Sequence, residues 1–406
     1  MNIGIERKLH VFAVTAHGRQ ELEFQEGETL FEVLRKNWIP WSSVSVYYKE
    51  DGEGSEVITP ALDKPLVSST PGAYMVYFNR NVNLFKFALD NFSVAPAEGD
   101  QPAATEYFYQ LYDNEKAEVT TVLKKLSPEL CRQLVADRVC EVLATIPKGA
   151  KIIVGVSGGG DSNALLYGMS RAAKQFSLDI HPIIIKGIPE WDEGVARAKE
   201  LSENYGLPLH VVEDGEVRRI FGIPASGPSL MERFEKEFQG DDFEYFATLI
   251  IRVVLSSLSR KIGANYICTG ANLEDVTSDA LFRVINGWSP APLPVRQIGD
   301  QALVMPLWLC PKKIIDGCFP KFSLENYEMR YPCMSLGRSL YYGLTFNLQS
   351  NFPGVIERFI QGAAALAEND PTKYTLHEQL GFEVERQIPL PLLTKFERML
   401  GRRPIV

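Results

Sequence analysis

The sequence predicts an α/β protein: a doubly wound parallel sheet with a small α+β domain in front of it. Through the middle of the chain, short β-branched runs alternate with amphipathic helical segments, which is the element order of a parallel sheet. The run at 152–156 (IIVGV) carries no charge, as expected of a strand buried on both faces. Before residue 92 the order differs, because strands there precede and follow a single helix.

The first 91 residues predict a separate module. Residues 8–14 and 20–24 flank a His-Gly turn and predict a hairpin. Thr29 precedes a short amphipathic helix (LFEVLRKN), and VSVYY and AYMVYF supply two further strands. This β,β,α,β,β order is typical of a β-grasp, ubiquitin-like module over residues 1–91. Sulfur carriers of this kind need a free Gly-Gly end, whereas this chain continues through YFNRNVNLF, so we expect a docking or structural role.

The rest of the chain is predicted to form the main domain. Residues 92–105 (FSVAPAEGDQPAAT) are rich in Ala, Pro and Gly and predict a linker. Residues 106–147 read as helical and amphipathic, and strands ending near 157, 187 and 269 follow, separated by helices. The loops after these strands are expected to converge on one site at the carboxyl edge of the sheet. The domain is assigned to 106–379, and 380–406 to a C-terminal extension without chemistry.

Charge bears on the partners of the chain. There are 51 acidic and 42 basic residues, a formal charge of −9, which is unfavourable for a general nucleic-acid binder. The net charge still allows a local basic patch, because four basic residues are near one another in the sequence: Lys312, Lys313, Arg330 and Arg338.

Cysteine usage and hydropathy indicate the compartment. The six cysteines form no CxxC pair, which argues against a disulfide framework and against a zinc ribbon. The N-terminus has no apolar stretch behind its charges, and no run approaches the length of a membrane span. We therefore expect a cytoplasmic protein without membrane contact.

Residues 157–162 (SGGGDS) stand between a predicted strand and a predicted helix. Glycines at 158–160 allow backbone amides to approach a ligand closely, and a helix N-terminus adds partial positive charge. This combination predicts a phosphate cradle, with a plain tight turn as the alternative. The patterns GxxxxGK[ST] and GxGxxG do not fit, because the lysine and the third glycine that they require are missing.

SGGxDS after a strand resembles the PP-loop of the N-type ATP pyrophosphatases, a superfamily with a HUP-like doubly wound sheet. Residues 120–366 are most similar to its tRNA 2-thiolation branch. The supporting segments are ICTGANLEDV at 267–276, MPLWLCPKKII, YEMRYPCMSLGRS and FPGVIE. The resemblance implies that ATP is cleaved to AMP and pyrophosphate while a substrate oxygen is adenylated, with ATP and Mg²⁺ as cofactors.

The resemblance also implies site residues. The ATP phosphates would be held by Ser157, Gly158, Gly159, Gly160, Asp161 and Ser162. Asp161 would also be the catalytic carboxylate that helps to hold Mg²⁺, with a helix N-cap as its structural alternative. The family's adenosine-binding backbone corresponds to Lys186 and Gly187, and Thr269 and Gly270 end the fourth strand facing the same cleft.

One acidic motif departs from the family pattern. Relatives typically read GHNxDDxxET where this chain reads GANLEDVTSD, so Ala271 replaces the histidine and Ser278-Asp279 replace Glu-Thr. Asp275 is retained, and the resemblance implies a catalytic carboxylate on the Mg²⁺ or phosphate side. A solvated acid at a helix start is the alternative.

A second departure concerns sulfur. Relatives hold an iron–sulfur cluster with a CxxC near the long helix and a cysteine in a later Pro-Cys. Here the helix carries no cysteine, while Pro332-Cys333 is kept, and one thiol cannot hold a cubane cluster. Cys333 is then a nucleophile carrying a persulfide, a packed thiol, or an unusual ligand together with Cys310 and Cys318. We expect no iron–sulfur cluster and no structural zinc.

These observations favour an ATP pyrophosphatase that forms AMP and acts as a thiolase or a ligase. After adenylation, sulfur or an amine displaces AMP, and a donor protein is a partner for that step. The predicted acceptor is a small molecule or a modified base, whereas tRNA is disfavoured. Trp288, Pro290 and Pro292 would form an apolar wall for it, with a plain packed loop as the alternative. The alternatives are a tRNA 2-thiolase with atypical cysteines and an ATP-binding scaffold without turnover.

Overall fold

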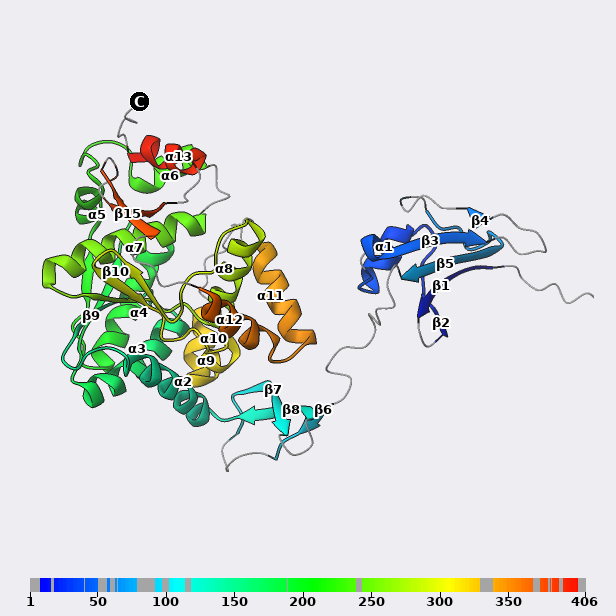
Figure 1. The fold of residues 1–406 in the computed structure, drawn as a ribbon, viewed down its shortest axis with the longest axis horizontal. Helices are drawn as coiled ribbons and strands as arrows, with labels where there is room; N and C mark the ends of the chain where they lie inside the picture. The colour runs from blue at the N-terminus through cyan, green and yellow to red at the C-terminus, as the bar shows by residue number, and fades with distance from the viewer. Residues whose placement is uncertain are drawn as a thin grey trace, which may run out of the picture. The chain divides into compact units, whose positions relative to one another are not determined.

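The structure is a computed structural model, which describes residues 8–400 apart from 16–17, 40, 50–56, 59–62, 64, 79–91, 97–101, 114–117, 188, 239–242, 329–338, 368–372, 379, 381 and 387–389. The chain divides into two compact units, Met1–Asp90 and Asn91–Val406, and each is described by itself (Figure 1). None of the helices in the described residues combines the length and the hydrophobicity needed to cross a lipid bilayer.

The N-terminal unit is a five-stranded sheet with one α-helix. The chain enters it through a hairpin, and β1 and β5 pair in parallel at the centre, in the order β2-β1-β5-β3-β4. Its elements are β1 (Leu9–Thr15), β2 (Gly18–Glu21), α1 (Leu30–Lys36), η1 (Trp41–Ser43), β3 (Val44–Lys49), β4 (Val57–Ile58) and β5 (Gly72–Phe78). Leu30 and Val33 of α1 are buried against Val11 and Val76 of the sheet. The ubiquitin-like assignment of this unit stays a prediction.

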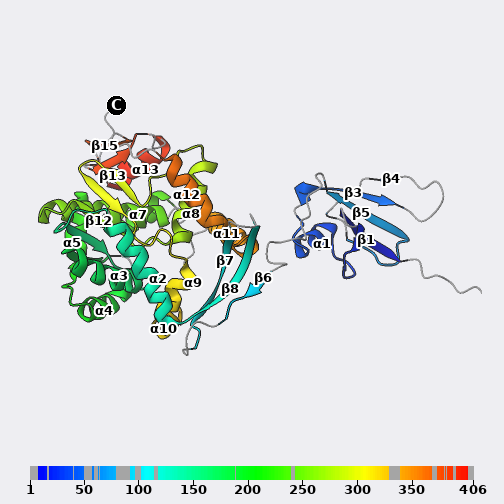
Figure 2. The same ribbon diagram turned by 60° about the horizontal axis from the view of Figure 1, so that its bottom comes forward.

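The second unit begins with a three-stranded sheet, where helix was predicted. Its strands are β6 (Phe92–Val94), β7 (Thr105–Asp113) and β8 (Glu118–Leu126), so β6 lies inside the predicted linker. The helical prediction for 106–147 is wrong over its first half, and α2 (Pro128–Leu143) begins only after Ser127 caps it. The cause is the aromatic, β-forming composition of TEYFYQLYD, which favours a pleated strand. β7 packs beside α9 (Lys312–Cys318) (Figure 2).

The main sheet has six strands in the order β11-β10-β9-β12-β14-β13, and all of its pairings are parallel except β13 with β14. Its strands are β9 (Lys151–Gly155), β10 (Asp179–Ile185), β11 (His210–Val212), β12 (Tyr266–Cys268), β13 (Val295–Ile298) and β14 (Gln301–Val304). The helices between them are α3 (Gly160–Phe176), α4 (Pro189–Asn204), α5 (Asp214–Phe221), α6 (Leu230–Phe238), α7 (Phe243–Ile262) and α8 (Leu273–Ile285). The predicted α/β fold class is confirmed.

Helices cover both faces of this sheet, because successive apolar residues of its strands point to opposite faces and both must be buried. Ile152 and Val154 of β9 belong to the same hydrophobic cluster as Leu165 of α3, whereas Ile153 packs in the cluster of Val254 on α7. The chain runs from β9 to β10 on one side and later returns to β12 on the other side. The carboxyl end of β9 is therefore a topological switch point, where open α/β sheets bind ligands.

The C-terminal residues are part of the domain core. After α9 come α10 (Pro320–Glu328), α11 (Ser339–Asn351), α12 (Val355–Leu366), β15 (Tyr374–His377), β16 (Phe382–Glu385) and α13 (Leu390–Leu400). Phe382, Val384 and Phe396 are buried in the cluster that also contains Phe238 of α6. The boundary predicted at residue 379 thus does not separate structural units, because β15 and β16 form one hairpin across it.

The contact between α2 and α3 depends on a glycine. A Cβ atom on Gly168 would lie 2.8 Å from Cβ of Val139. We expect Gly168→Ala to lower the free energy of unfolding by about 1–3 kcal/mol, the usual cost of overpacking a core. Urea unfolding measures this, with Gly362→Ala as the control: a Cβ there meets nothing within 4 Å, so it should gain about 0.5–1 kcal/mol from helix propensity. Equal changes in both variants would contradict the packing argument.

Candidate functional site

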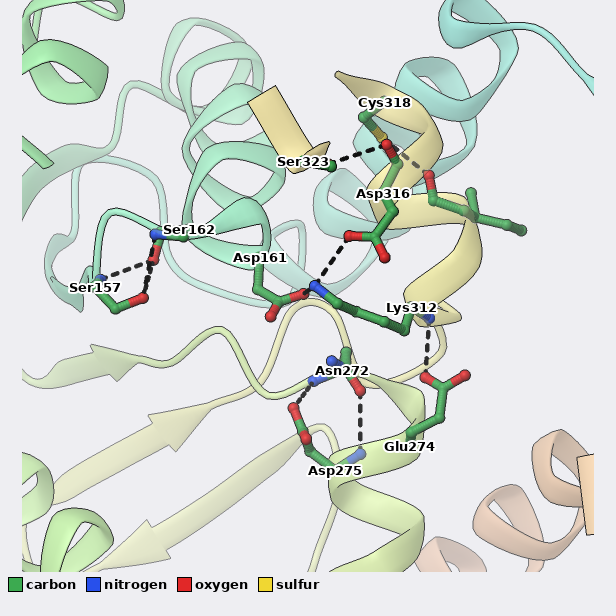
Figure 3. Close-up of polar contacts among 12 residues, drawn as sticks. Ser157, Asp161, Ser162, Asn272, Glu274, Asp275, Lys312, Asp316, Cys318 and Ser323 are labelled. Atoms are coloured by element: carbon green, nitrogen blue, oxygen red, sulfur yellow. Dashed lines mark hydrogen bonds and ion pairs between the residues drawn. The ribbon is translucent and has the colours of Figure 1, made fainter. Parts of the chain in front are cut away.

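The loop between β9 and α3 is held together by its two serines. The Ser157 amide donates to Ser162 Oγ at 2.8 Å, and the two hydroxyl oxygens lie 3.2 Å apart (Figure 3). Gly159 is the N-cap of α3 and no side chain caps it, so the structural alternative of an Asp161 N-cap does not hold. The first amides of α3 are then available to an anion, as at other helix N-termini that bind phosphate.

The same loop is pressed against α4. Gly158 has a φ of 77°, and a Cβ atom on it would lie 2.5 Å from the carbonyl oxygen of Gly194. A Cβ atom on Gly194 would in turn lie 2.2 Å from the carbonyl oxygen of Ser157. Arg197 adds a hydrogen bond from Nε to the Gly158 carbonyl at 3.2 Å. The loop conformation therefore requires glycine on both sides of this contact.

The side chain of Lys312 on α9 lies between two carboxylates, one at the start of α3 and one on α9 itself. Lys312 Nζ donates to Asp161 Oδ1 at 3.0 Å and lies 3.1 Å from Asp316 Oδ1 (Figure 3). Burial alone would lower the pKa of Lys312, but the two carboxylates outweigh it and raise the pKa above its ordinary value. A Cβ atom on Gly160 would lie 3.7 Å from this Nζ, which places the ammonium group beside the loop of residues 157–162. We call this loop the phosphate loop, after its predicted role.

These residues also fit Mg²⁺. In phosphate-transfer sites the ion uses one or two carboxylates and completes its shell with substrate phosphates and water. Asp161 offers such a carboxylate at the loop, one third exposed. No group of three His, Cys, Asp or Glu side chains in the described part of the chain forms a complete protein-only metal site. An ion at Asp161 would complete its shell with water and with oxygens of a bound molecule.

The start of α8 carries the second acidic motif. Asn272 Oδ1 accepts from the Asp275 amide at 3.1 Å, and the Asn272 amide donates to Asp275 Oδ2 at 3.0 Å, which forms a capping box. Tyr342 of α11 donates to Asp275 Oδ1 at 2.8 Å. Asp275 thus caps a helix, and it also faces the cavity described below, so its catalytic role stays a prediction.

Glu274 connects this helix to the lysine. It is buried, its Oε2 accepts from the Lys312 amide at 2.9 Å, and its Oε1 accepts from Gln349 Nε2 at 3.1 Å. Gln349 also donates to the Tyr107 hydroxyl at 3.0 Å, which itself donates to Glu357 at 2.6 Å. This network from Tyr107 to Lys312 holds the start of α9 in place.

Glu274 makes stability depend on pH. Burial outweighs its hydrogen bonds and raises the pKa of Glu274 to about 7. In the unfolded chain this carboxyl has a pKa of about 4.3. Between these two pKa values the folded state binds more protons than the unfolded state, so the free energy of unfolding falls as pH rises toward 7. Between about pH 5 and pH 8, we expect the free energy of unfolding of Glu274→Gln to fall by about 1–3 kcal/mol less than that of the wild type. Urea unfolding across this range measures it, with exposed Glu203→Gln as the control, and parallel curves for Glu274→Gln and wild type would contradict it.

A cavity of about 540 Å³ opens from the phosphate loop. Ser157, Asp161 and Ser162 of this loop line it, together with residues at the ends of β10 and β12. Residues of α7, β13 and the C-terminal hairpin form the rest of its lining. A volume of this size is within the range of about 300–1,000 Å³ that small-ligand sites occupy.

The predicted site residues divide into three groups. Ser157, Asp161, Ser162, Thr269, Gly270 and Asp275 line the cavity, and so does Trp288, whereas Gly158, Gly159, Gly160, Pro290 and Pro292 are not among its lining residues. Lys186 and Gly187 are not among its lining residues: Lys186 Nζ pairs with Glu213 at 2.8 Å, and the Gly187 amide donates to Asp192 at 3.0 Å. Cys333, Arg330 and Arg338 lie outside the described residues.

Two cysteines of the proposed cluster set are core thiols. Cys310 and Cys318 are buried in the hydrophobic cluster of α2 and α3, and burial raises the pKa of the Cys310 thiol to about 12. Both side chains are therefore packed among apolar residues, as is usual for buried cysteines.

Sequence reasoning missed two parts of the site. Lys312 was predicted only as part of a basic patch, although a lysine in the first turn of a helix opposes the helix dipole and marks a special position. Arg252 and Arg296 were not identified at all, and both line the cavity. Their positions on α7 and β13 gave no signal, because nothing in their local sequence shows that they face the same space.

Comparison with known proteins finds distant relatives of this chain. No protein-family model matches the chain. The tRNA(Ile)-lysidine synthase of Clostridioides difficile is 25% identical over 237 residues, which are 55% of this chain and 47% of that protein. Cytoplasmic tRNA 2-thiolation protein 1 of Bos taurus is 26% identical over 159 residues, 36% of this chain and 44% of that protein. The chain thus matches less than half the length of these relatives.

Among solved structures, the U34-tRNA thiolase NcsA of Methanococcus maripaludis with its [4Fe-4S] cluster is similar at a TM-score of 0.49 and 18% identity, over 72% of this chain and 94% of that one. NMN synthetase of Francisella tularensis has a TM-score of 0.33 at 13% identity, over 68% of this chain and 94% of that one. The sequence relatives confirm the predicted resemblance to the PP-loop ATP pyrophosphatases.

Proposed function

We propose that this protein is an ATP-dependent adenylating enzyme. The observation that carries the proposal is the shared cavity: the uncapped start of α3, the Asp161–Lys312 pair and an open volume beside them lie at one edge of the sheet. Negative charge is favoured at the loop, and the adjoining space accommodates an acceptor.

The reaction has two steps. An oxygen of the acceptor attacks the α-phosphorus of ATP, and the bond from that phosphorus to the β-phosphate oxygen breaks, which releases pyrophosphate. Sulfur or an amine then adds to the activated carbon, and AMP leaves with the oxygen. The catalytic contribution of the protein is positioning and neutralisation of charge.

Each group at the loop has a role in this scheme. The amides of α3 and the hydroxyls of Ser157 and Ser162 donate hydrogen bonds to the phosphates, and the Lys312 ammonium offsets the charge of the departing pyrophosphate. Asp161 would hold Mg²⁺ together with ATP, and the ion would supply further neutralisation of the phosphate oxygens. Asp275 is the candidate for a further carboxylate on the Mg²⁺ or phosphate side, and Cys333 is the candidate nucleophile for the second step.

For the acceptor we propose a nucleobase. The relatives are by name a lysidine synthase and a thiolation protein of tRNA, which favours a base in tRNA and leaves both an amine and sulfur as the nucleophile. The formal charge of −9 favours a free base or another small flat molecule. A donor protein for the nucleophile is part of this proposal.

Release of pyrophosphate and AMP tests the proposal. The assay contains ATP and Mg²⁺, with total tRNA in one arm and free nucleobases and nucleosides in the other. We expect acceptor-dependent release by the wild type and none by Asp161→Ala, while Asp179→Ala, at the amino end of β10, stays active. ATP binding without release in either arm would instead indicate the scaffold. Tight, salt-sensitive tRNA binding with tRNA-dependent AMP would identify tRNA as the substrate.

A further inference from the structure

Two arginines line the cavity from elements other than the phosphate loop. Arg252 comes from α7 and Arg296 from β13, and Tyr374 and Glu385 of the C-terminal hairpin lie beside them. We call these four residues the arginine end of the cavity. Figure 1 shows β15 of that hairpin next to α7.

The hydrogen-bonding capacity of the two arginines is only partly used. Arg252 donates from Nη1 to the Glu383 carbonyl at 2.6 Å, and no carboxylate of the described chain lies within ion-pair distance of it. Arg296 lies 3.9 Å from Asp279 and has Tyr374 as a hydrogen-bonding neighbour, but its Nε is buried without a hydrogen-bond partner in the described residues. Burying a guanidinium with donors unpaired is costly, so this arrangement calls for a further acceptor.

The carboxylates nearby are shared with other arginines. Glu385 pairs with Arg283 at 2.6 Å, and Glu383 pairs with Arg260. Burial would raise the pKa of Glu385, but Arg283 and Arg296 outweigh it and lower the pKa, so this carboxylate is ionised near neutral pH. Asp161, Asp275 and Asp279 also line the cavity, so its lining carries no net positive charge. What remains for a ligand is therefore the unused hydrogen-bond donors of Arg252 and Arg296, not an excess of positive charge.

The walls next to the arginines are apolar, and their residues come from the C-terminal segment. Phe382, Val384, Leu392 and Phe396 line the cavity there. The guanidinium of Arg252 lies 6.0 Å from the ring centroid of Phe382, which orients it by a cation–π contact. Apolar walls beside buried guanidinium groups suit a largely apolar body with one acidic group.

We propose that the arginine end binds an anionic group of the acceptor, a carboxylate or a phosphate, through Arg252 and Arg296. Guanidinium groups suit both anions, because their forked donors match paired oxygens. This inference rests on the proposed function, and it specifies the class of acceptor: a planar molecule that carries an acidic group at its end away from the adenylated oxygen.

Two pairs of probes test this by isothermal titration calorimetry. Orotate is compared with uracil, and UMP with uridine, since each pair differs by one anionic group. The protein is first saturated with α,β-methylene-ATP, so that UMP cannot bind at the nucleotide site. We expect the anionic member of one pair to bind at least about ten-fold tighter, the size of one charge-assisted contact. Preference within the first pair identifies a carboxylate, and within the second a phosphate.

Variants connect the preference to the arginines. Arg252→Gln and Arg296→Gln should remove it, and Arg296→Lys, which keeps the charge but not the fork, should keep part of it. Arg260→Gln is the matched control, because it removes an arginine of the same helix that does not line this cavity. Binding of α,β-methylene-ATP, and a cooperative thermal transition, should be unchanged in all four variants.

The outcomes separate this inference from the proposed function. Equal binding of anionic and neutral probes to the wild type, or an undiminished preference in Arg296→Gln, would overturn the arginine end as an anion site. Failure of the wild type to bind α,β-methylene-ATP would overturn the proposed function, and the probes titrated without it would still report on the arginines.

Discussion

Replacing Lys312 by alanine is expected to slow pyrophosphate release by about 10²–10³-fold, the usual effect of removing one preorganised donor from a charged transition state. Lys312 Nζ lies 3.0 Å from Asp161 and 3.1 Å from Asp316, so its loss leaves two carboxylates beside the phosphate loop. Their repulsion of the nucleotide should also weaken ATP binding. Single-turnover release of AMP and direct titration of ATP measure the two effects.

Lys313→Ala is the matched control for this prediction. Lys313 is the next residue in the same helix turn, but it is exposed. Lys312→Arg should recover part of the activity, since it restores the charge with a different geometry. A rate for Lys312→Ala that matches Lys313→Ala would show that the ammonium group is not part of the reaction.

Gly158→Ala is expected to abolish ATP binding at concentrations that saturate the wild type. The added Cβ would lie 2.5 Å from the Gly194 carbonyl, and the φ of 77° strains any other residue, so the loop or α4 must move. Stability should fall by about 1–3 kcal/mol as well. Gly149→Ala is the control, because its φ is 79° but its Cβ would meet nothing within 4 Å. Nucleotide titration and urea unfolding compare them, and equal losses would assign the effect to backbone strain alone.

The parts of the fold that sequence predicted are those with local patterns. β9 and the loop after it were predictable, because an uncharged β-branched run, three glycines and a helix start occupy one short segment. The strands β7 and β8 were taken for helix although TEYFYQLYD is rich in β-forming residues. The hairpin β15–β16 was overlooked because its partners are α6 and α7, far earlier in the chain.

The site was predictable only where a single motif contains it. Ser157, Asp161 and Ser162 are within one loop, but Lys312 reaches Asp161 from 151 positions away. Arg252 and Arg296 meet at the cavity only because the order of strands places β13 at the sheet edge under the C-terminal hairpin. No periodicity in the sequence predicts that these two arginines lie close together, because their proximity depends on how the sheet and the helices pack.

The network from Tyr107 to Lys312 has a consequence for folding kinetics. The contact of Tyr107 with Glu357 spans 250 positions, and its contact with Gln349 spans 242. Contacts of such high contact order close large loops and form slowly, whereas the strand, loop and helix around Ser157 contact β10, β12 and α4, which all precede Lys312 in the chain. During synthesis the phosphate loop is therefore complete long before its lysine is fixed. The chain gains its full charge arrangement only after α12 has left the ribosome, so nucleotide affinity should be among the last properties to appear in refolding.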